Sequence, residues 1–301
     1  MKDLLVFDFG GTTVKYGIFA NNELAEIKHF STPLSWEEAK KIMDGIKAEY
    51  ETTYQLSGMA FSFPGCVDNQ NGEILGVSAI QYIHHFPIKK DLEAHYSLPV
   101  SIENDANCAA LAECWKGAAK GKENVLFVIV GTGIGGGVIV NGKLQTGAHL
   151  FGGELGFAIL GEEADGTPIS LSRYGTAVHM ATRYCKRKRV EKGTFSGKDI
   201  FELAERGDVL AVEEVELFYK YLSRGLYNMQ MSIDPEMIII GGGISANPAI
   251  VQKLEDRTNE LISAEIKDFT TKIVPCLYQN NANLLGAAKN FLDTHQDETD
   301  N

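Results

Sequence analysis

Leu4-Leu5-Val6-Phe7-Asp8-Phe9-Gly10-Gly11-Thr12-Thr13 is the stretch that decides the fold of this chain. Its four leading apolar residues predict a buried strand, and the carboxylate of Asp8 stands near the end of that strand. The two glycines and two hydroxyl residues that follow allow backbone N–H groups to approach an anion closely. A second apolar run, Tyr16-Gly17-Ile18-Phe19, predicts the returning strand. The stretch therefore predicts a β-hairpin that holds phosphate.

The same pattern occurs a second time, 120 residues further along the chain. The shift places Leu5-Val6-Phe7-Asp8 over Val125-Leu126-Phe127-Val128, and six of the twenty positions from 5 to 24 are identical in the second copy. Two glycine-rich hairpins about one domain apart indicate a duplicated fold whose halves face each other across a nucleotide. Because Asp8 corresponds to Val128, only the first hairpin can help to hold a metal ion.

Composition limits the classes of protein that this chain can belong to. Its 301 residues are enough for two domains, and 44% hydrophobic and 23% charged residues are typical of a globular protein. The formal net charge of -12 disfavours a nucleic-acid-binding surface. Five widely spaced cysteines without a C-x-x-C pair indicate neither a disulfide framework nor a cysteine-rich zinc site. With no visible signal peptide and an apolar run at 125–140 that five glycines interrupt, we expect a cytoplasmic protein that does not enter the membrane.

Periodicity predicts the remaining elements. A helix is expected at 35–51, a buried strand at 58–63 ended by Pro64-Gly65, a helix at 88–96 and a strand at 98–102. The period then changes from strand to helix, with Asn104 or Asp105 as N-cap. The second half predicts a hairpin at 125–140 turned by Asn141-Gly142, mainly helical segments from 172 to 232, a strand at 238–240, a helix opened by Asn247-Pro248 and a last helix at 282–292. The polar tail at 296–301 is expected to be frayed.

The glycines at Gly131-Thr132-Gly133-Ile134-Gly135-Gly136 fit the G-x-G-x-x-G pattern of dinucleotide-binding folds. That motif requires a helix after the glycines, whereas Val138-Ile139-Val140 followed by Asn-Gly predicts a strand and a tight turn. We therefore favour a second phosphate-holding hairpin over a dinucleotide site. A purely structural glycine turn remains the alternative.

Asp105 is the candidate for catalysis. Phosphoryl transfer to an alcohol needs a carboxylate that accepts the hydroxyl proton, and a helix N-terminus favours the ionised form of such a group. An N-cap aspartate without catalytic function is the alternative, which the neighbouring Asn104 and the phosphate hairpins make less favourable.

Other polar residues have both functional and structural interpretations. Asp8 can order a Mg²⁺ ion and its waters or only form a turn, and Lys15 can face phosphate or only solvent. Glu154 lies between glycines and suits a bidentate grip on two sugar hydroxyls, unless it is a solvated loop residue. The basic run at 186–189 resembles a nucleic-acid patch, but on a helix of an acidic chain we interpret it as a solvated face. His84 and His85 lack metal-ligand spacing and can border a substrate pocket.

Taken together, these motifs resemble the ROK family (repressor, open reading frame, kinase) of bacterial sugar kinases. The resemblance rests on Asp8-Phe9-Gly10-Gly11-Thr12, Phe63-Pro64-Gly65-Cys66-Val67-Asp68, Glu103-Asn104-Asp105-Ala106-Asn107, Gly131-Thr132-Gly133-Ile134-Gly135-Gly136-Gly137, Gly152-Gly153-Glu154-Leu155-Gly156 and Ile240-Gly241-Gly242-Gly243. The motifs follow the family's order and cover nearly the whole chain.

The resemblance implies an α/β fold of the actin-like ATPase type, with two ribonuclease-H-like domains and an active-site cleft between them. Residues 1–117 would form the sugar and phosphate domain, completed by a C-terminal helix at 282–301, and residues 118–281 a larger nucleotide-binding domain. The family implies Asp105 as general base, a sugar held by Gly65, Asn104, Asp105 and Glu154, a homodimer, and Mg²⁺ held through water by Asp8. ATP and its phosphates would be bound by Gly10, Gly11, Thr12, Thr13, Lys15, Gly131, Thr132, Gly133, Gly242 and Gly243.

Two features depart from the family pattern. Phe157 stands where many members carry a zinc-binding histidine, and no cysteine occurs between Cys114 and Cys185, so we expect no zinc site. Members without zinc include kinases for β-glucosides and for N-acetylmannosamine, and the segment 79–86 is more similar to the β-glucoside kinases.

Three hypotheses follow. The first is an ATP-dependent kinase acting on the 6-hydroxyl of a hexose or β-glucoside, with N-acetylmannosamine kinase and glucokinase or fructokinase as alternatives. The second is a sugar-responsive transcription regulator of the same family, which the absence of an N-terminal helix-turn-helix and the acidic charge disfavour. The third is an actin-like ATPase without a small acceptor.

Overall fold

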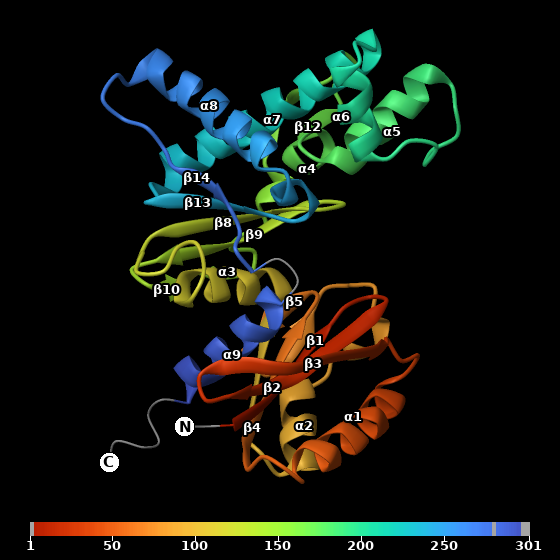
Figure 1. Cartoon of the computed structure of the whole chain (residues 1–301), viewed down its shortest axis with the longest axis vertical. Coiled ribbons are helices and arrows are strands. Elements are labelled where there is room, and N and C mark those ends of the chain that lie inside the picture. The colour runs from red at the N-terminus through yellow and green to blue at the C-terminus, as the bar shows by residue number, and fades with distance from the viewer. Residues whose placement is uncertain (1–2, 279–280, 296–301) are drawn as a thin grey trace. The chain divides into compact units, whose positions relative to one another are not determined.

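A computed structural model describes residues 3–278 and 281–295 of the chain (Figure 1). The chain divides into two compact units. Unit 1 comprises Met1–Lys116, Gly147–Phe151 and Asn280–Asn301, and unit 2 comprises Gly117–Thr146 and Gly152–Gln279. The predicted tail at 296–301, and with it the last residues of the helix expected at 282–301, lies outside the described residues.

Unit 1 is built on a five-stranded mixed sheet. Its strand order is β3 (Glu23–Ser31), β2 (Thr13–Ala20), β1 (Asp3–Phe9), β4 (Leu56–Phe63) and β7 (Val100–Asn104). The first three strands are antiparallel, whereas β1, β4 and β7 run parallel. A small hairpin of β5 (Cys66–Asp68) and β6 (Glu73–Leu75) follows β4. The helices are α1 (Trp36–Tyr50), α2 (Ile88–Tyr96), α3 (Asp105–Trp115) and α9 (Ala282–Thr294).

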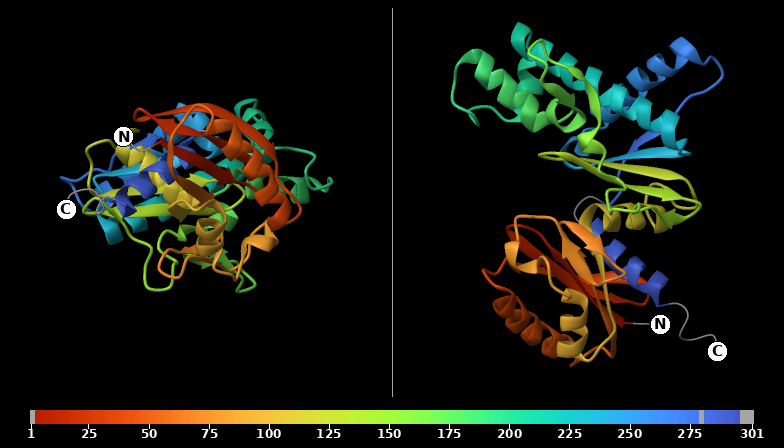
Figure 2. Two further views of the ribbon diagram at one scale, coloured as in Figure 1. Left: turned by 90° about the horizontal axis from the view of Figure 1, so that it is seen from below. Right: turned by 180° about the vertical axis from the view of Figure 1, so that it is seen from behind.

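Alternation along the strands divides the unit 1 sheet into two buried faces. Leu5, Phe7 and Phe9 of β1 form one core with α1 and α2. The other face packs against α9, which is joined to the sheet by a hydrogen bond from Asn290 Nδ2 to the carbonyl oxygen of Ile102. Figure 2 shows α1 in red-orange and α9 in blue on opposite faces of this sheet. Helix α9 approaches α3 so closely that a Cβ atom at Gly286 would overlap the α3 backbone. Glycine at this position therefore allows the contact.

Unit 2 repeats this sheet. Its order is β10 (Lys143–Leu144), β9 (Ile134–Val140), β8 (Val125–Val130), β13 (Met237–Gly241) and β14 (Ile273–Pro275), with β8, β13 and β14 parallel. Its core joins the sheet to a helical layer of α4 (Leu171–Tyr174), α5 (Ala177–Lys188), α6 (Gly197–Glu205), α7 (Val209–Ile233) and α8 (Pro248–Glu265). A second small hairpin, β11 (Ile159–Glu162) and β12 (Pro168–Ser170), precedes α4.

The two sheets confirm the duplication. In each, two antiparallel strands follow the first strand and two parallel strands complete the other side. The pairing differs by one residue in the first hairpin, because Leu5 pairs with Ile18 whereas Val125 pairs with Ile139. The second turn has the same register in both copies, since Ala20 pairs with Glu23 and Val140 with Lys143. The two sequences align without a gap, but the strand pairing across the glycine turn differs by one residue between the two copies.

Local sequence explains most element boundaries. Ser35 caps α1 by accepting a hydrogen bond from the Glu38 backbone N–H, and Asn247 caps α8 with proline at its first position. Asn21 and Asn22 both have positive φ, as a tight turn between twisted strands requires. The features that were not predicted include the β11–β12 hairpin and the short edge strand β14. Both are too short to show periodicity.

Over residues 3–278 and 281–295, every helix falls short of the length or apolar character needed to cross a bilayer. All five cysteines are in the reduced thiol form.

Candidate active site

Three parallel strands of unit 1 end together and present polar side chains at their carboxyl ends. In the sheet register Asp8 of β1 lies beside Ser62 of β4, and Ser62 lies beside Glu103 of β7. The carboxyl ends of parallel strands are where α/β folds bind their ligands. The row leads directly to Asn104 and Asp105, where β7 passes into α3.

Asp8 is buried at this row, with 9% of its surface exposed. Its Oδ1 accepts hydrogen bonds from Ser62 Oγ at 2.7 Å and from Asn283 Nδ2 at 3.0 Å. Burial raises the pKa of Asp8, while these two donors and the positive charge of Lys15 oppose the rise. Lys15 is the cross-strand neighbour of Asp8. Ser62 and Asn283 lie 54 and 275 residues from Asp8 in sequence, so no local pattern could have identified them.

Asn104 and Asp105 form the start of α3. Asn104 is the N-cap, since its Oδ1 accepts hydrogen bonds from the backbone N–H groups of Ala106 and Asn107. Asp105 is the first helical residue, so the structure selects Asn104 from the two predicted caps. Its Oδ1 accepts hydrogen bonds from Asn104 Nδ2 at 3.0 Å and from the Ala106 N–H at 2.8 Å.

The surroundings of Asp105 raise its pKa to about 6. Burial is the main cause, and the negative charge of Asp8 adds to it, whereas the Ala106 N–H and the Asn104 amide oppose it. A carboxylate with a pKa near 6 is ionised at neutral pH and is a better proton acceptor than an ordinary aspartate. This arrangement gives unit 1 a carboxylate suited to general-base chemistry.

Gly65 lies beside this carboxylate. Its carbonyl oxygen accepts a hydrogen bond from Asn104 Nδ2 at 3.0 Å. Its φ of +109° is a conformation that favours glycine, and a Cβ atom would lie 2.9 Å from His84 Cε1. His84 is held by a 2.7 Å hydrogen bond between its Nε2 and Ser78 Oγ. The structure therefore brings together Asp8, Gly65, Asn104 and Asp105 within unit 1. The His84 ring lies on the side of the Gly65 turn where a Cβ atom would point.

The tip of the first hairpin, Gly10 to Thr13, is tied down at its base. The Gly10 N–H donates to the Thr13 carbonyl at 3.0 Å, and Thr32 Oγ1 donates to the Gly10 carbonyl at 2.6 Å. Gly11 and Thr12 are exposed at the tip. The hairpin thus presents its glycine and hydroxyl groups to solvent on a fixed backbone.

The second hairpin confirms the prediction of a strand in place of a helix, although β9 (Ile134–Val140) already begins within the glycine motif. At Gly131 and Gly133 φ is not in the left-handed region, and a Cβ atom would meet nothing closer than 3.7 Å. Gly243, after β13, is equally open. The fold does not require glycine at these three positions, which agrees with space kept for a ligand. Gly242 differs, since its φ is +82° and a Cβ would overlap the Val130 carbonyl.

Two of these open glycines border a cavity of about 740 Å³ within unit 2. Gly131 and Gly243 line one part of it, and apolar side chains line the rest, among them Val178 of α5, Phe201 of α6 and Ile250 of α8. Lys198 and Glu202 add charged groups. The helical lining residues have no signature in the sequence, because their spacing is that of ordinary amphipathic helices.

Glu154 lies on unit 2, in the loop before a short 3-10 turn, and its side chain is exposed. The glycines around it have a structural purpose that the sequence does not reveal. A Cβ atom at Gly153 would overlap the Gly136 carbonyl, and one at Gly156 would overlap the Ile134 carbonyl. The glycines therefore allow the loop to lie directly on β9, and Glu154 is the exposed residue between them.

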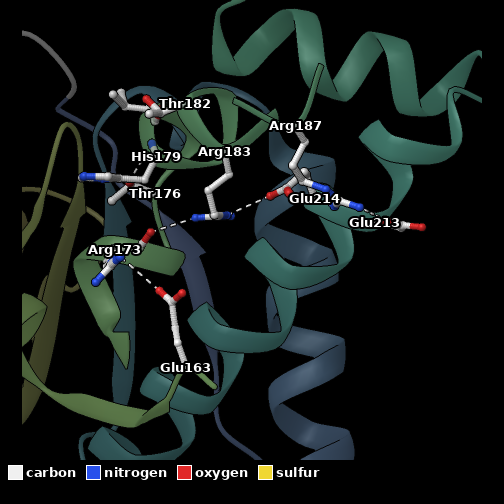
Figure 3. Close-up of polar contacts among 10 residues, drawn as sticks. Glu163, Arg173, Thr176, His179, Thr182, Arg183, Arg187, Glu213 and Glu214 are labelled. Atoms are coloured by element: carbon white, nitrogen blue, oxygen red, sulfur yellow. Dashed lines mark hydrogen bonds and ion pairs between the residues drawn. The ribbon is translucent and has the colours of Figure 1, made fainter. Parts of the chain in front are cut away.

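The basic run at 186–189 takes part in ion pairs within unit 2. Arg187 pairs with Glu213 and with the buried Glu214 of α7, and Lys188 pairs with Asp208. Figure 3 shows Arg183, one turn earlier, between Glu214 and the Arg173 carbonyl. The interpretation as a solvated face is therefore incomplete, because this run holds α5 against α7.

Within residues 3–278 and 281–295, no group of three or more His, Cys, Asp or Glu side chains is arranged to hold a metal ion. Phe157, at the position of the family's zinc-binding histidine, is 72% exposed. Mg²⁺ at phosphates needs only one or two carboxylates and otherwise binds water and phosphate oxygens. Asp8 supplies one buried carboxylate, and the two hydrogen bonds from Ser62 and Asn283 are both accepted by its Oδ1. This carboxylate fits that requirement.

Comparison with known proteins identifies the family of the chain. Residues 5–294 match the ROK family. The chain belongs to the ROK family. A beta-glucoside kinase of Listeria monocytogenes is 32% identical over 292 residues, covering 96% of this chain and 97% of the relative. A beta-glucoside kinase of Klebsiella pneumoniae is 30% identical over 300 residues, covering 99% of this chain and 98% of the relative. These relatives confirm the resemblance to the β-glucoside kinases of the family.

Solved ROK structures share the fold. A ROK family protein from Streptococcus pneumoniae, solved in complex with sucrose, has a TM-score of 0.88 and 33% identity over 98% of this chain and 99% of its own. The ROK hexokinase from Thermus thermophilus has a TM-score of 0.85 and 28% identity over 98% of this chain and 99% of its own. The predicted α/β, two-domain fold of the actin-like ATPase type is confirmed.

Proposed function

We propose that this protein is an ATP-dependent carbohydrate kinase that transfers the γ-phosphate of ATP to the 6-hydroxyl of a hexose or a β-glucoside, with Asp105 as general base. The observation that carries the proposal is the carboxylate of Asp105. It lies at the carboxyl end of the parallel strands, beside the Gly65 turn, with a pKa of about 6. Relatives of this chain in the ROK family are named as sugar kinases, which supports the same chemistry for this protein.

Asp105 would accept the proton of the attacking hydroxyl group. Both of its side-chain hydrogen bonds described above are accepted by Oδ1, so Oδ2 is the oxygen that would take this proton. The fixed Oδ1 contacts hold the carboxylate in one orientation, which lowers the entropic cost of reaching the transition state. The Asn104 side chain donates to this carboxylate and to the Gly65 carbonyl, so a single residue would hold the base and the sugar-binding Gly65 turn in place relative to each other.

The nucleotide would be bound by both glycine turns. In unit 2 the cavity beside Gly131 and Gly243 offers apolar walls for a purine, and its open glycines would allow phosphate oxygens to reach backbone N–H groups. In unit 1 the exposed tip at Gly11 and Thr12 would contact the transferred phosphate. Lys15 would add a positive charge near it.

Asp8 would hold Mg²⁺, through water, by the carboxylate oxygen that does not accept the Ser62 and Asn283 hydrogen bonds. When bound, Mg²⁺ would neutralise charge that develops on the phosphates. The residues of this chain orient the carboxylate for that purpose, because Ser62 and Asn283 fix it from two different elements.

Gly65, Asn104, Asp105 and Glu154 would bind the sugar, and the similarity to beta-glucoside kinases favours a β-glucoside as acceptor. N-acetylmannosamine kinase and glucokinase or fructokinase activity are the alternatives within the family. Glu154→Ala should raise the KM for the sugar while leaving the KM for ATP unchanged. We also propose a cytoplasmic location, which the five reduced cysteines support, and a homodimer as in the family, which light scattering would test.

The decisive experiment measures ADP release with glucose, fructose, mannose, N-acetylmannosamine, N-acetylglucosamine and cellobiose, with and without added zinc. One of these sugars should raise ADP release well above the rate without sugar. Asp105→Asn should lower kcat at least about 100-fold. Because burial disfavours the ionised carboxylate, the same substitution should leave thermal stability equal or higher. ATP hydrolysis that no sugar changes would reject the kinase proposal and favour an ATPase without a small acceptor.

A further inference from the structure

Glu103 is a buried carboxylate whose hydrogen bonds join two separate parts of unit 1. Only 2% of its surface is exposed. Its Oε1 accepts hydrogen bonds from the Asn104 N–H at 2.8 Å and from Asn107 Nδ2 at 3.0 Å. Its Oε2 accepts a hydrogen bond from Asn69 Nδ2 at 2.8 Å. One oxygen therefore serves the start of α3, and the other serves the β5–β6 turn.

Asn69 is held in place by a rigid turn. Asp68 Oδ1 accepts hydrogen bonds from the backbone N–H groups of Gln70 and Asn71, and Asp68 Oδ2 accepts one from Asn71 Nδ2 at 2.8 Å. The Gly72 N–H closes the turn on the Asp68 carbonyl at 2.8 Å. Turns with this side-chain pattern have little freedom, so the position of Asn69 is fixed relative to β5.

The short strand β5 is consequently tied to the β7–α3 junction at both ends. Before the strand, the Gly65 carbonyl accepts from Asn104 Nδ2 at 3.0 Å. After the strand, Asn69 donates to Glu103. Asn104 and Glu103 are adjacent residues that directly precede Asp105. Hydrogen bonds at both ends of β5 fix its orientation as well as its distance relative to the β7–α3 junction. A hydrogen bond at one end would leave the strand free to rotate about that point.

A burial cost accompanies this arrangement. Withdrawing a carboxylate from water is unfavourable, and burial raises the pKa of Glu103 while its three amide donors oppose the rise. Hydrogen bonds to a charged acceptor are stronger and more directional than those between neutral groups. A carboxylate can also accept from both sides at once, so it can join Asn69 to Asn107 and the Asn104 backbone.

We propose that Asn69 and Glu103 are positioning residues that hold the Gly65 turn at a fixed distance and angle from Asp105. This inference rests on the proposed sugar kinase function, because it assigns the Gly65 turn to the acceptor sugar. Neither residue touches the reacting atoms. Glu103 acts by geometry, since the charge that raises the pKa of Asp105 belongs to Asp8.

The first test replaces Asn69 by alanine. Asn69 is exposed, so Asn69→Ala should fold normally, and Gln70→Ala in the same turn is the matched control. Loss of a hydrogen bond to a charged group should lower kcat/KM for the sugar about three- to tenfold. The KM for ATP, the slow hydrolysis of ATP without sugar and the pH midpoint of activity should not change. A general loss of structure would change all of them.

The second test reverses the polarity of the pair. Asn69→Asp places a carboxylate against Glu103 and should lower kcat/KM for the sugar more than Asn69→Ala does. Adding Glu103→Gln to Asn69→Asp restores a donor and an acceptor, because the glutamine amide can donate to Asp while its carbonyl still accepts from the Asn104 N–H. The double variant should recover to within about twofold of the wild-type value if the pair positions the turn.

Equal behaviour of Asn69→Ala and Gln70→Ala, or no recovery in the double variant, would overturn the proposal. Sugar affinity measured by calorimetry separates this outcome from failure of the kinase proposal. The probe is the sugar with the fastest ADP release, or cellobiose if no sugar accelerates it. Wild-type protein without sugar-dependent ADP release rejects the kinase function, whereas equal sugar affinity in Asn69→Ala and wild type rejects the positioning role.

Discussion

Acidification should stop sugar phosphorylation over a pH range that the surroundings of Asp105 set. A general base must be ionised, and burial together with the charge of Asp8 raises the pKa of Asp105 to about 6. The ionised fraction then falls from about ten elevenths at pH 7 to about one eleventh at pH 5, so kcat/KM should fall about tenfold. An aspartate with the ordinary pKa of 3.8 would lose less than about a tenth of its activity over the same range.

Removing the neighbouring charge should move this midpoint downward. In Asp8→Asn the negative charge that opposes ionisation of Asp105 is absent, so the midpoint should shift to lower pH. Total activity should also fall, because Asp8 is the proposed Mg²⁺ residue, and each profile must be compared with its own plateau. Asp165→Asn is the control, since this exposed carboxylate lies on unit 2 and should leave the midpoint unchanged.

The assay should count sugar phosphate in timed samples between pH 4.5 and 8, because coupling enzymes have their own pH limits. Activity that returns after transfer from pH 5 to pH 8 shows that the protein has not unfolded. Unfolding through Asp105 is not expected on acidification. Its raised pKa disfavours the native ionised form, so its unfavourable contribution to stability grows as pH rises from 3.8 towards about 6 and is absent at lower pH. A profile that stays flat down to pH 5 would refute the assignment of Asp105 as the base.

Five further substitutions test the packing and the glycine turns. Glu214→Ala removes the buried partner of Arg183 and should lower the free energy of unfolding in urea by about 3–5 kcal/mol, whereas Glu213→Ala, an exposed partner of Arg187, should change it by less than about 1 kcal/mol. Gly131→Ala should raise the KM for ATP with an unchanged melting temperature, whereas Gly242→Ala should lower the melting temperature, because only Gly242 has a positive φ and a carbonyl in the way. Gly286→Ala should lower the melting temperature as well, since the added methyl group overlaps the α3 backbone. The reasoning on glycine would be wrong if Gly131→Ala and Gly242→Ala had the same effect on both quantities.

Local sequence accounted for much of the fold because its signals are short in range. Continuous runs of apolar residues predicted β1 and β8, Ser35 and Asn247 marked helix starts, and Asn141-Gly142 marked a tight turn. The 120-residue repeat predicted a duplicated fold, and the two sheets of the same strand order confirm it. The short strands β11, β12 and β14 escaped prediction because three or four residues do not establish a period.

The sequence also identified the residues at the end of β7, but not what surrounds them. Asn104 and Asp105 stood out because a strand passes into a helix there. A carboxylate at a helix N-terminus, next to a carboxamide, is suited to accept a hydroxyl proton. The pKa of Asp105 could not be inferred, since it depends on burial and on Asp8, nearly a hundred residues earlier in the chain. The same holds for Asn283, which contacts Asp8 only because α9 packs against the first sheet.

By itself, then, the sequence determined the strand, hairpin and cap positions, the duplication and the family, because these follow from neighbouring residues and from repeated motifs. Tertiary structure alone decided which glycines are open to a ligand and which are filled by the protein's own backbone, and it joined Asn69 to Glu103 across two strands. The physical reason is that hydrogen bonding, burial and close contact depend on distance in space. Distance along the chain does not reveal which groups will share a buried environment.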